Sequence, residues 1–310
     1  MKIRQFVAGI AAVIALAVGF AQSDDPIGWL RAAVSHDSHA GRERGSAQAH
    51  REPRQARAHI RAGALSERDA LALYSGAQQR PGFDACVDQF PQEQPLTLAL
   101  VPSSMQPLAL CSDDFAVLYS QTSKTPLVVV ERLNAARLAQ AQGNPRTDNF
   151  YADPRIPRAS RADLADYRSA HPAVDRGHQS PAADAPTAQA MAQSFALSNM
   201  VPQDPTNNRK IWNKIESDVR KFARRARGDV FVFTGPLFDN DHDTVGPGQV
   251  WVPTHLYKLV YDVASGRAWA YVLPNTATAI EAPVDYRTFL ARTSLPLLQN
   301  EKVTGGIAGS

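Results

Sequence analysis

Apolar stretches bounded by polar turns predict strands through the second two-thirds of the chain. They are rich in Val, Phe, Tyr and Leu and are four to seven residues long, as is typical of β-strands. The predicted strands cover residues 114–120, 127–132, 229–235, 250–253, 256–262 and 268–273. We expect the first two strands to form a hairpin around residues 121–125, and Gly235-Pro236 to end the third.

Helical periodicity dominates one long segment, residues 208–227, which Gly228 would end. Its apolar positions recur every three or four residues and give the helix one buried face: Trp212, Ile215, Val219 and Phe222. Its last turns are crowded with cations: Arg220, Lys221, Arg224, Arg225 and Arg227. These cations match the helix macrodipole, and they would also suit contacts with phosphates.

Three shorter segments have mixed patterns. Residues 134–142 predict a helical turn or a loop, residues 189–197 a short strand or helix, and residues 285–299 a terminal helix interrupted at Pro296. Closely spaced strands with helices set apart from them indicate an α+β fold. We expect a central, mostly antiparallel sheet with helices packed on it.

The first 21 residues have the pattern of a signal peptide. Lys2 and Arg4 precede an apolar stretch, residues 6–20, that is short for a membrane span. Small residues stand at −3 and −1 of a cleavage site after Ala21. We therefore expect export to the periplasm or the medium, without stable membrane association after cleavage. An uncleaved membrane anchor is the alternative.

Residues 22–81 differ in composition from the rest of the chain. They are rich in Ala, Arg and Gln and poor in aromatic and β-branched residues, so they can bury little apolar surface. We interpret them as a low-complexity segment or linker, with an arginine-rich nucleic-acid-binding arm as the alternative. Within them, Ser66-Glu67-Arg68-Asp69 predicts the start of a short helix. Residues 82–310 then form the globular domain.

Export also decides the interpretation of the two cysteines, Cys86 and Cys111. In an oxidising compartment we expect them to form a disulfide. It would contribute roughly 3 kcal/mol in the chain-entropy view. Two buried free thiols are the alternative.

Composition and charge are ordinary for a globular protein. Hydrophobic residues make up 44% of the chain and charged residues 20%. Without Lys2 and Arg4 the chain keeps 31 basic and 30 acidic residues, a net charge near +1. Overall charge therefore does not argue for nucleic acid, and local patches would have to attract it.

Three short blocks carry the candidate chemistry. They are Asp175-Arg176-Gly177-His178, Ser198-Asn199-Met200-Val201-Pro202-Gln203, and the segment from Asn208 to Glu216. In the third block, Asn208, Trp212 and Glu216 are spaced i, i+4 and i+8, which places them along one helix face. A neutral base, an oxygen ligand and a nearby arginine are the groups that metal-assisted phosphodiester cleavage needs.

Together the three blocks resemble the DNA/RNA non-specific endonucleases, the ββα-metal nucleases that include endonuclease G. The family signature is Asp-Arg-Gly-His, then Ser-Asn-x-x-Pro-Gln, then Asn-x-x-x-Trp-x-x-x-Glu, and all three occur here in order. One block alone would be a weak match, whereas three in order are a strong one. The resemblance implies a ββα unit on one face of the sheet, within a nuclease domain at residues 82–310.

The resemblance also implies roles for the main site residues. His178 would be the general base, and its ordinary pKa near 6.5 suits that task. Asn208 would bind Mg²⁺, or alternatively Mn²⁺, through its amide oxygen, and Glu216 would hold waters of the ion. A plain helix cap and an exposed helix glutamate are the respective alternatives. Trp212 is expected in the core rather than against a base.

Further residues complete the expected site. Arg176 and Asn199 would contact phosphate or position the loop, and Asp175 would anchor the loop rather than bind metal. In the family an arginine, an aromatic residue and an aspartate precede the first block. Their nearest counterparts in this sequence, with the arginine in a catalytic role, are Arg146, Phe150 and Asp153.

The expected function is hydrolysis of DNA and RNA by an exported, magnesium-dependent endonuclease. Two alternatives stay open: a nucleotide phosphodiesterase on the same fold, and a catalytically silent DNA-binding or uptake protein. Besides DNA and RNA, a second copy of the chain and an inhibitor protein are the partners considered.

Overall fold

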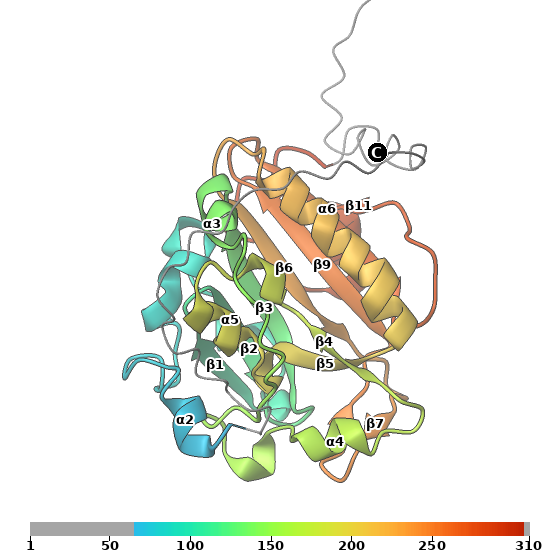
Figure 1. Cartoon of the computed structure of the whole chain (residues 1–310). Coiled ribbons are helices and arrows are strands. Elements are labelled where there is room, and N and C mark those ends of the chain that lie inside the picture. Colours follow the sequence, from blue (N-terminus) through green and yellow to red (C-terminus); the bar gives the residue numbers. More distant parts are fainter. Residues whose placement is uncertain (1–64, 307–310) are drawn as a thin grey trace, which may run out of the picture.

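A seven-stranded antiparallel sheet forms the centre of the computed structural model, which describes residues 65–306 (Figure 1). The strand order is β1-β2-β3-β6-β9-β10-β11. These strands are β1 Pro107–Cys111, β2 Phe115–Ser120, β3 Thr125–Leu133, β6 Val230–Leu237, β9 His255–Asp262, β10 Arg267–Pro274 and β11 Val284–Asp285. The α+β class with a central antiparallel sheet, predicted from the sequence, is thereby confirmed.

Two small ribbons and several helices surround the sheet. The ribbons pair β4 Asp175–His178 with β5 Met200–Gln203, and β7 Thr244–Val245 with β8 Val250–Trp251. The α-helices are α2 Glu67–Leu71, α3 Ala135–Gln140, α4 Leu164–Arg168, α5 Ala188–Ser194, α6 Asn213–Ala223 and α7 Tyr286–Thr293. Short 3-10 turns are η1 Asp84–Gln89, η2 Pro91–Glu93, η3 Leu98–Leu100, η4 Ser103–Met105, η5 Arg158–Ser160, η6 Ala182–Asp184 and η7 Leu197–Asn199. A π-helical turn, η8 Asn207–Trp212, leads into α6.

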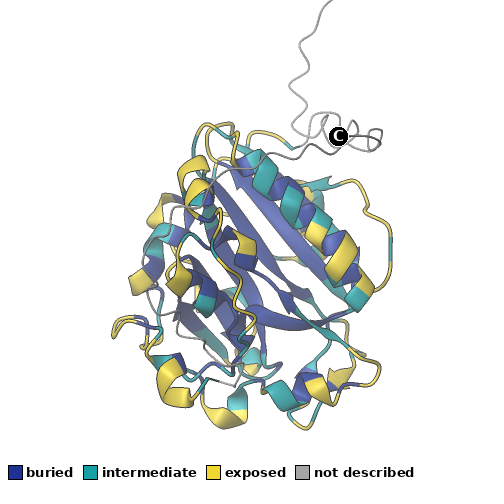
Figure 2. Ribbon diagram, in the orientation of Figure 1, coloured by how far each residue is buried: buried dark blue, intermediate teal, exposed yellow. Residues whose placement is uncertain are grey.

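Strand alternation divides the core between the two faces of the sheet. On β6, Val230 and Val232 pack toward α6, whereas Phe231 and Phe233 pack toward the opposite face. Helix α7 covers that opposite face through Phe289. Helix α6 and the β4–β5 ribbon lie on the first face (Figures 1 and 2). The face under α6 therefore carries the segments that contain the three sequence blocks.

The structure differs from the sequence prediction at three element ends. Strand β6 continues through Gly235, where a Cβ would lie 2.2 Å from the carbonyl oxygen of Leu127, so this glycine allows close strand approach instead of ending the strand. The predicted long helix starts with a π turn and its α-helical part ends at Ala223, before Gly228. Helix α7 ends at Thr293, before Pro296.

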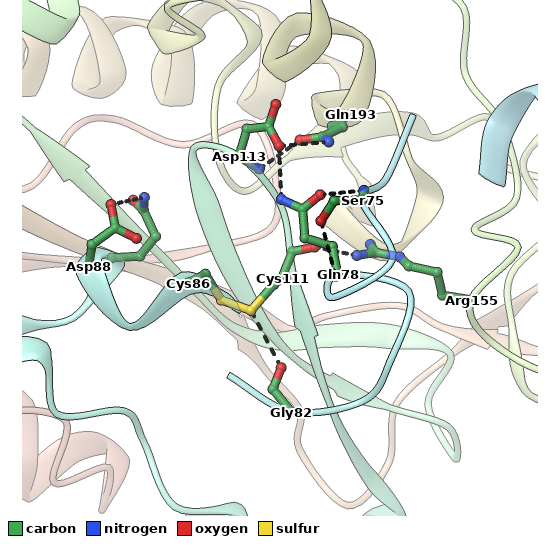
Figure 3. The surroundings of a disulfide bond; sticks show 10 residues. Ser75, Gln78, Gly82, Cys86, Asp88, Cys111, Asp113, Arg155 and Gln193 are labelled. Atoms are coloured by element: carbon green, nitrogen blue, oxygen red, sulfur yellow. Dashed lines mark hydrogen bonds between the residues drawn. A yellow bond between two sulfur atoms is a disulfide. The ribbon is translucent and has the colours of Figure 1, made fainter. Parts of the chain in front are cut away.

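A disulfide joins Cys86 in η1 to Cys111 at the end of β1, with 5.5 Å between the Cα atoms (Figure 3). The expected pairing is thus present. Ser66 caps α2 by accepting a hydrogen bond from the backbone N–H of Asp69, as the sequence predicted. The expectations for residues 1–64 lie outside the described residues. Across residues 65–306, no helix has the length and apolar character to cross a membrane.

Candidate active site

A pocket of about 200 Å³ gathers side chains from the first and third of the blocks that carry the candidate chemistry, together with Arg146 from an earlier loop. Helix α6 forms one wall, and β4 with the η6 turn forms the other. The lining residues are Arg146, Arg176, His178, Pro181, Ala182, Ala183, Asn208, Arg209, Asn213, Glu216 and Arg220. His178, Asn208 and Glu216, far apart in the sequence, thus face one space.

Pairing of β4 with β5 brings the first block next to the third. Asp175 is opposite Gln203, and His178 is opposite Met200. Gly177 is required in this ribbon, because a Cβ there would lie 1.9 Å from the side-chain oxygen of Gln203. Since only three residues separate Gln203 at the end of β5 from η8, Asp175 comes within hydrogen-bond reach of Asn208.

Asp175 determines which way the Asn208 amide points. Its carboxylate accepts hydrogen bonds from Nδ2 of Asn208 at 2.9 Å and from the Arg209 guanidinium at 2.8 and 2.6 Å. Burial raises the pKa of Asp175, but these donors outweigh burial and hold the pKa below its usual range. An ionised carboxylate only accepts, so Asn208 must turn Nδ2 toward it and Oδ1 away. Asp175 therefore anchors and orients the site.

The donor set fits a hard cation that retains most of its water. Within residues 65–306, no group of three or more His, Cys, Asp or Glu side chains is arranged to hold a metal ion. In the same range, no protein hydrogen bond engages the Asn208 Oδ1, and Glu216 lines the same pocket. One amide oxygen with a nearby carboxylate suits Mg²⁺, which prefers oxygen ligands and dehydrates reluctantly.

His178 lies in an aromatic box beside two arginines. Its ring centroid is 5.1 Å from that of Phe195, which it meets edge to face, and 5.7 Å from that of Phe150. Burial, followed by the charges of Arg146 and Arg176, lowers the pKa of His178 to about 3. The ordinary pKa expected from the sequence is therefore not retained. The imidazole is neutral at neutral pH and free to accept a proton.

The pKa of Glu216 is raised, whereas that of His178 is lowered. Burial raises the pKa of this partly buried carboxyl to about 7, although Lys258 and Arg220 oppose the rise. Lys258 is 1% exposed and donates from Nζ to Thr234 Oγ1 at 2.7 Å. A small change in local charge can thus switch Glu216 between its two protonation states near neutral pH.

Arg146 and Arg176 both line the pocket, and each lies over one ring of the aromatic box. The Arg176 guanidinium lies 4.1 Å from the Phe150 ring centroid, and the Arg146 guanidinium lies 5.0 Å from that of Phe195. Arg146 is exposed and pairs with Asp148 at 2.6 Å, a bond that solvent weakens. Both cations can therefore meet an anion in the pocket.

Asn199 and Trp212 are buried scaffold residues. Asn199 is fully buried and makes three hydrogen bonds of 2.9 Å, two to the backbone of Ser180 and one to that of Ser194. It positions the loop after His178 and has no surface to offer a phosphate, which corrects the phosphate-contact part of the prediction. Trp212 is also fully buried, in the core between α6 and the sheet, as expected.

Sequence reasoning missed a catalytic candidate, Arg220, and two buried groups beneath the pocket, Glu131 and Lys258. Arg220 lines the pocket and is held by the buried carboxylate of Asp184. The sequence placed Arg220 among five cations at the helix end that suit contacts with phosphates, but its position four residues after Glu216, on the same helix face, is the signal that singles it out. Glu131 and Lys258 stand inside apolar strands, where only the fold shows which face they occupy.

Comparison with known proteins agrees with this geometry. The profile of the DNA/RNA non-specific endonuclease family matches residues 95–305, more than half of the chain. The Danio rerio protein named Nuclease EXOG, mitochondrial, is 34% identical over 203 residues, which cover 60% of this chain and 56% of that protein. Human Endonuclease G, mitochondrial, is 34% identical over 207 residues, covering 62% and 66% respectively.

A solved structure shares the fold. A chain from the crystal structure of the EndoG/EndoGI complex superimposes with a TM-score of 0.57 at 25% identity, covering 65% of this chain and 91% of that one. The match therefore spans little more than half of the Danio rerio nuclease but 91% of the chain in the solved structure. The protein belongs to the DNA/RNA non-specific endonuclease family.

Proposed function

We propose that the protein is an exported, magnesium-dependent endonuclease that hydrolyses phosphodiester bonds in DNA and RNA. The observation that carries the proposal is one pocket lined by His178, Asn208 and Glu216 together with four arginines. Family membership and the nuclease names of the relatives support the same chemistry. The Cys86–Cys111 disulfide supports an oxidising destination, the periplasm or the medium.

In this proposal His178 takes the proton of the attacking water. Its neutral imidazole has the required acceptor, and no competing protonation occurs at neutral pH. A phosphodiester anion bound beside Arg146 and Arg176 would neutralise the charges that disfavour an imidazolium. The pKa of His178 would then rise toward its ordinary range as substrate binds, which makes the imidazole a stronger base when it is needed.

The arginines and Asn208 act on the phosphate side of the reaction. Arg146, Arg176 and Arg220 would bind the non-bridging oxygens and stabilise the extra negative charge of the transition state. Asn208 would hold Mg²⁺ through Oδ1, with Glu216 orienting its waters. When bound there, the ion supplies Lewis-acid stabilisation of the phosphate and the leaving oxygen.

A digestion assay with supercoiled plasmid and with single-stranded RNA tests the proposal. The full-length protein should degrade both substrates in Mg²⁺ and neither with excess chelator. A His178→Ala protein purified identically controls for a contaminating nuclease. Intact plasmid and RNA, combined with cleavage of a small nucleotide diester, would replace the proposal with the phosphodiesterase alternative. Loss of all cleavage with retained DNA binding would favour the silent binding protein.

We also propose an inhibitor protein as a partner that binds over the pocket. The structural relative is a chain from the EndoG/EndoGI complex, a structure described as showing the mechanism of EndoG inhibition. A protein that covers the pocket would here have to neutralise several arginines, so we expect an acidic contact surface on it.

A further inference from the structure

The segment of residues 65–81, here called the strap, lies outside the family match at 95–305 and yet packs beside the pocket. Ala70 and Tyr74 of the strap are 1% and 3% exposed. They share one apolar cluster with Tyr151, with residues of α5, and with Phe195, the ring that meets His178 edge to face. The strap thus contributes to the packing behind the proposed base.

Polar contacts fix the strap to helix α5 and to the end of β1. The carbonyl oxygen of Leu73 accepts hydrogen bonds from Gln189 at 3.0 Å and Gln193 at 2.7 Å. Gln78 donates to Asp113 at 2.8 Å, and the same carboxylate oxygen accepts from Gln193 at 3.1 Å (Figure 3). Asp113 lies two residues after the disulfide-bonded Cys111, so the disulfide restrains the chain next to this junction.

Tyr74 is the residue through which the strap reaches the site. Its hydroxyl shares a 2.7 Å hydrogen bond with the hydroxyl of Tyr151, and the Arg155 guanidinium lies 3.6 Å from its ring centroid. Arg155 is itself held by the buried carboxylate of Asp153. Tyr74 is therefore fixed at its edge and on its face.

Tyr151 transmits this position to the aromatic box. Its carbonyl accepts from Leu197 N–H at 2.8 Å, and its N–H donates to the carbonyl of Phe195 at 3.3 Å. The Phe195 ring in turn closes one side of His178. Two hydrogen bonds therefore link Tyr74, through Tyr151, to the backbone of Phe195, whose ring packs against His178.

We propose that the strap is a working part of the active site and that Tyr74 is a positioning residue for His178. This inference rests on the proposed function only for its effect on turnover. Its structural consequence, shielding of His178 behind Phe195, holds whatever reaction the pocket performs. Displacing Tyr74 should free Tyr151 and Phe195 to move, open His178 to solvent and misalign it.

The test compares the full-length wild type with Tyr74→Ala and the milder Tyr74→Phe. Carbethoxylation of His178 by diethyl pyrocarbonate is followed by peptide mass spectrometry, with the exposed His171 as internal reference. Tyr74→Ala should raise the rate of carbethoxylation of His178, relative to that of His171, by roughly tenfold, because local opening around His178 becomes easier. Tyr74→Phe should give a smaller rise, because the ring remains while the bond to Tyr151 is lost.

Turnover of plasmid DNA is measured on the same proteins. Tyr74→Ala should lower kcat roughly 10- to 100-fold with little change in KM, the pattern of a misplaced catalytic group. Tyr257→Phe is the matched control, since it removes an equally buried tyrosine hydrogen bond, to the Leu127 carbonyl at 3.0 Å, in the core on the other face of the sheet. It should leave both the His178 labelling rate and kcat unchanged.

Unchanged His178 labelling and unchanged kcat in folded Tyr74→Ala, even with a lowered melting temperature, would overturn the inference and leave the strap a purely stabilising element. If Tyr74→Ala does not fold, the His178 labelling rate and the kcat of Tyr74→Phe test the inference instead. Absence of nuclease activity in the wild type would refute the proposed function, while the labelling experiment would still test the strap.

Discussion

The two faces of the central sheet are built from the same strands but differ in what they bury. The face under α7 is apolar, with Phe231, Phe233, Tyr257, Leu259 and Phe289 all at most 5% exposed. The face under α6 buries charged groups between the strands and the pocket. On β9, for example, Tyr257 and Leu259 point to the α7 face and Lys258 to the α6 face.

Buried carboxyls make the contrast sharper. Glu131 of β3 is 2% exposed and accepts a hydrogen bond from Ser180 at 2.9 Å, two residues after His178. Burial and the nearby Asp184 raise the pKa of Glu131 well above its usual range, although Lys258 opposes them. Replacing such groups with apolar residues would often stabilise a protein. The α6 face therefore buries ionisable groups next to the pocket, whereas the α7 face packs apolar side chains.

The largest expected effect is a loss of turnover when the proposed base on the α6 face is removed. His178→Ala should lower kcat by about 10²–10⁴-fold, the usual contribution of a positioned base. The free energy of unfolding should fall by only about 1–2 kcal/mol, because the removed ring packs on Phe150 and Phe195 but makes no hydrogen bond through its buried Nε2. Rate and urea unfolding are measured on the same preparation. Near-normal turnover would show that a group other than His178 accepts the proton of the attacking water.

A matching change on the α7 face should lower stability and leave turnover nearly unchanged. Phe289→Ala removes a fully buried ring and should lower the free energy of unfolding by about 3–5 kcal/mol. The kcat of the remaining folded molecules should stay within about twofold of wild type, since distant independent sites rarely couple. A large loss of kcat below the melting temperature would show that the two faces are not separable.

A smaller, pH-dependent effect is expected at Glu216. Its folded pKa of about 7 lies above the ordinary value of 4.5, so the folded state keeps a proton that the unfolded chain releases. The stability that comes from this protonated carboxyl is complete below about pH 4.5 and is lost as the pH rises through 7. Glu216→Gln should therefore stabilise the protein at pH 8 and have little effect at pH 4.5. Equal urea midpoints for variant and wild type at pH 8 would contradict the shift.

Much of the fold followed from the sequence because its signals are local. Apolar stretches bounded by polar turns predicted β2, β3, β6, β8, β9 and β10, and a 3–4 residue spacing predicted α6. The edge strand β1 was missed, since prolines at 102 and 107 interrupt its pattern. The π turn at Asn207–Trp212 was also missed, yet Asn208 and Glu216 still line one pocket.

The electrostatics of the site depend on contacts between distant segments. Three local blocks pointed to His178, Asn208 and Glu216, but the pKa shifts of His178 and Glu216 arise from burial and from partners elsewhere in the chain. Burial and the charges of Arg146 and Arg176 lower the pKa of His178, and burial raises that of Glu216 against the opposing charge of Lys258, which lies on another strand. Composition alone likewise gave no sign that Tyr74 would be buried next to Tyr151.

The role of Asn208 is central to the account, because this amide links the folded site to the proposed metal chemistry. Asn208→Ala should lose nearly all activity, and added Mg²⁺ should restore little, since no other group would position the ion. Asn208→Asp should bind Mg²⁺ at least as well but turn over more slowly, because its charge offsets part of the ion's charge. Glu216→Ala should be milder and partly rescued by excess Mg²⁺, because it acts through water.

Initial rate of plasmid cleavage against Mg²⁺ concentration, for wild type and these three variants, is the most direct test. The account predicts a saturable curve for wild type, a flat and near-zero curve for Asn208→Ala, a saturable curve with a low plateau for Asn208→Asp, and a curve shifted to higher Mg²⁺ for Glu216→Ala. Full activity of Asn208→Ala in the presence of chelator would contradict the metal mechanism altogether.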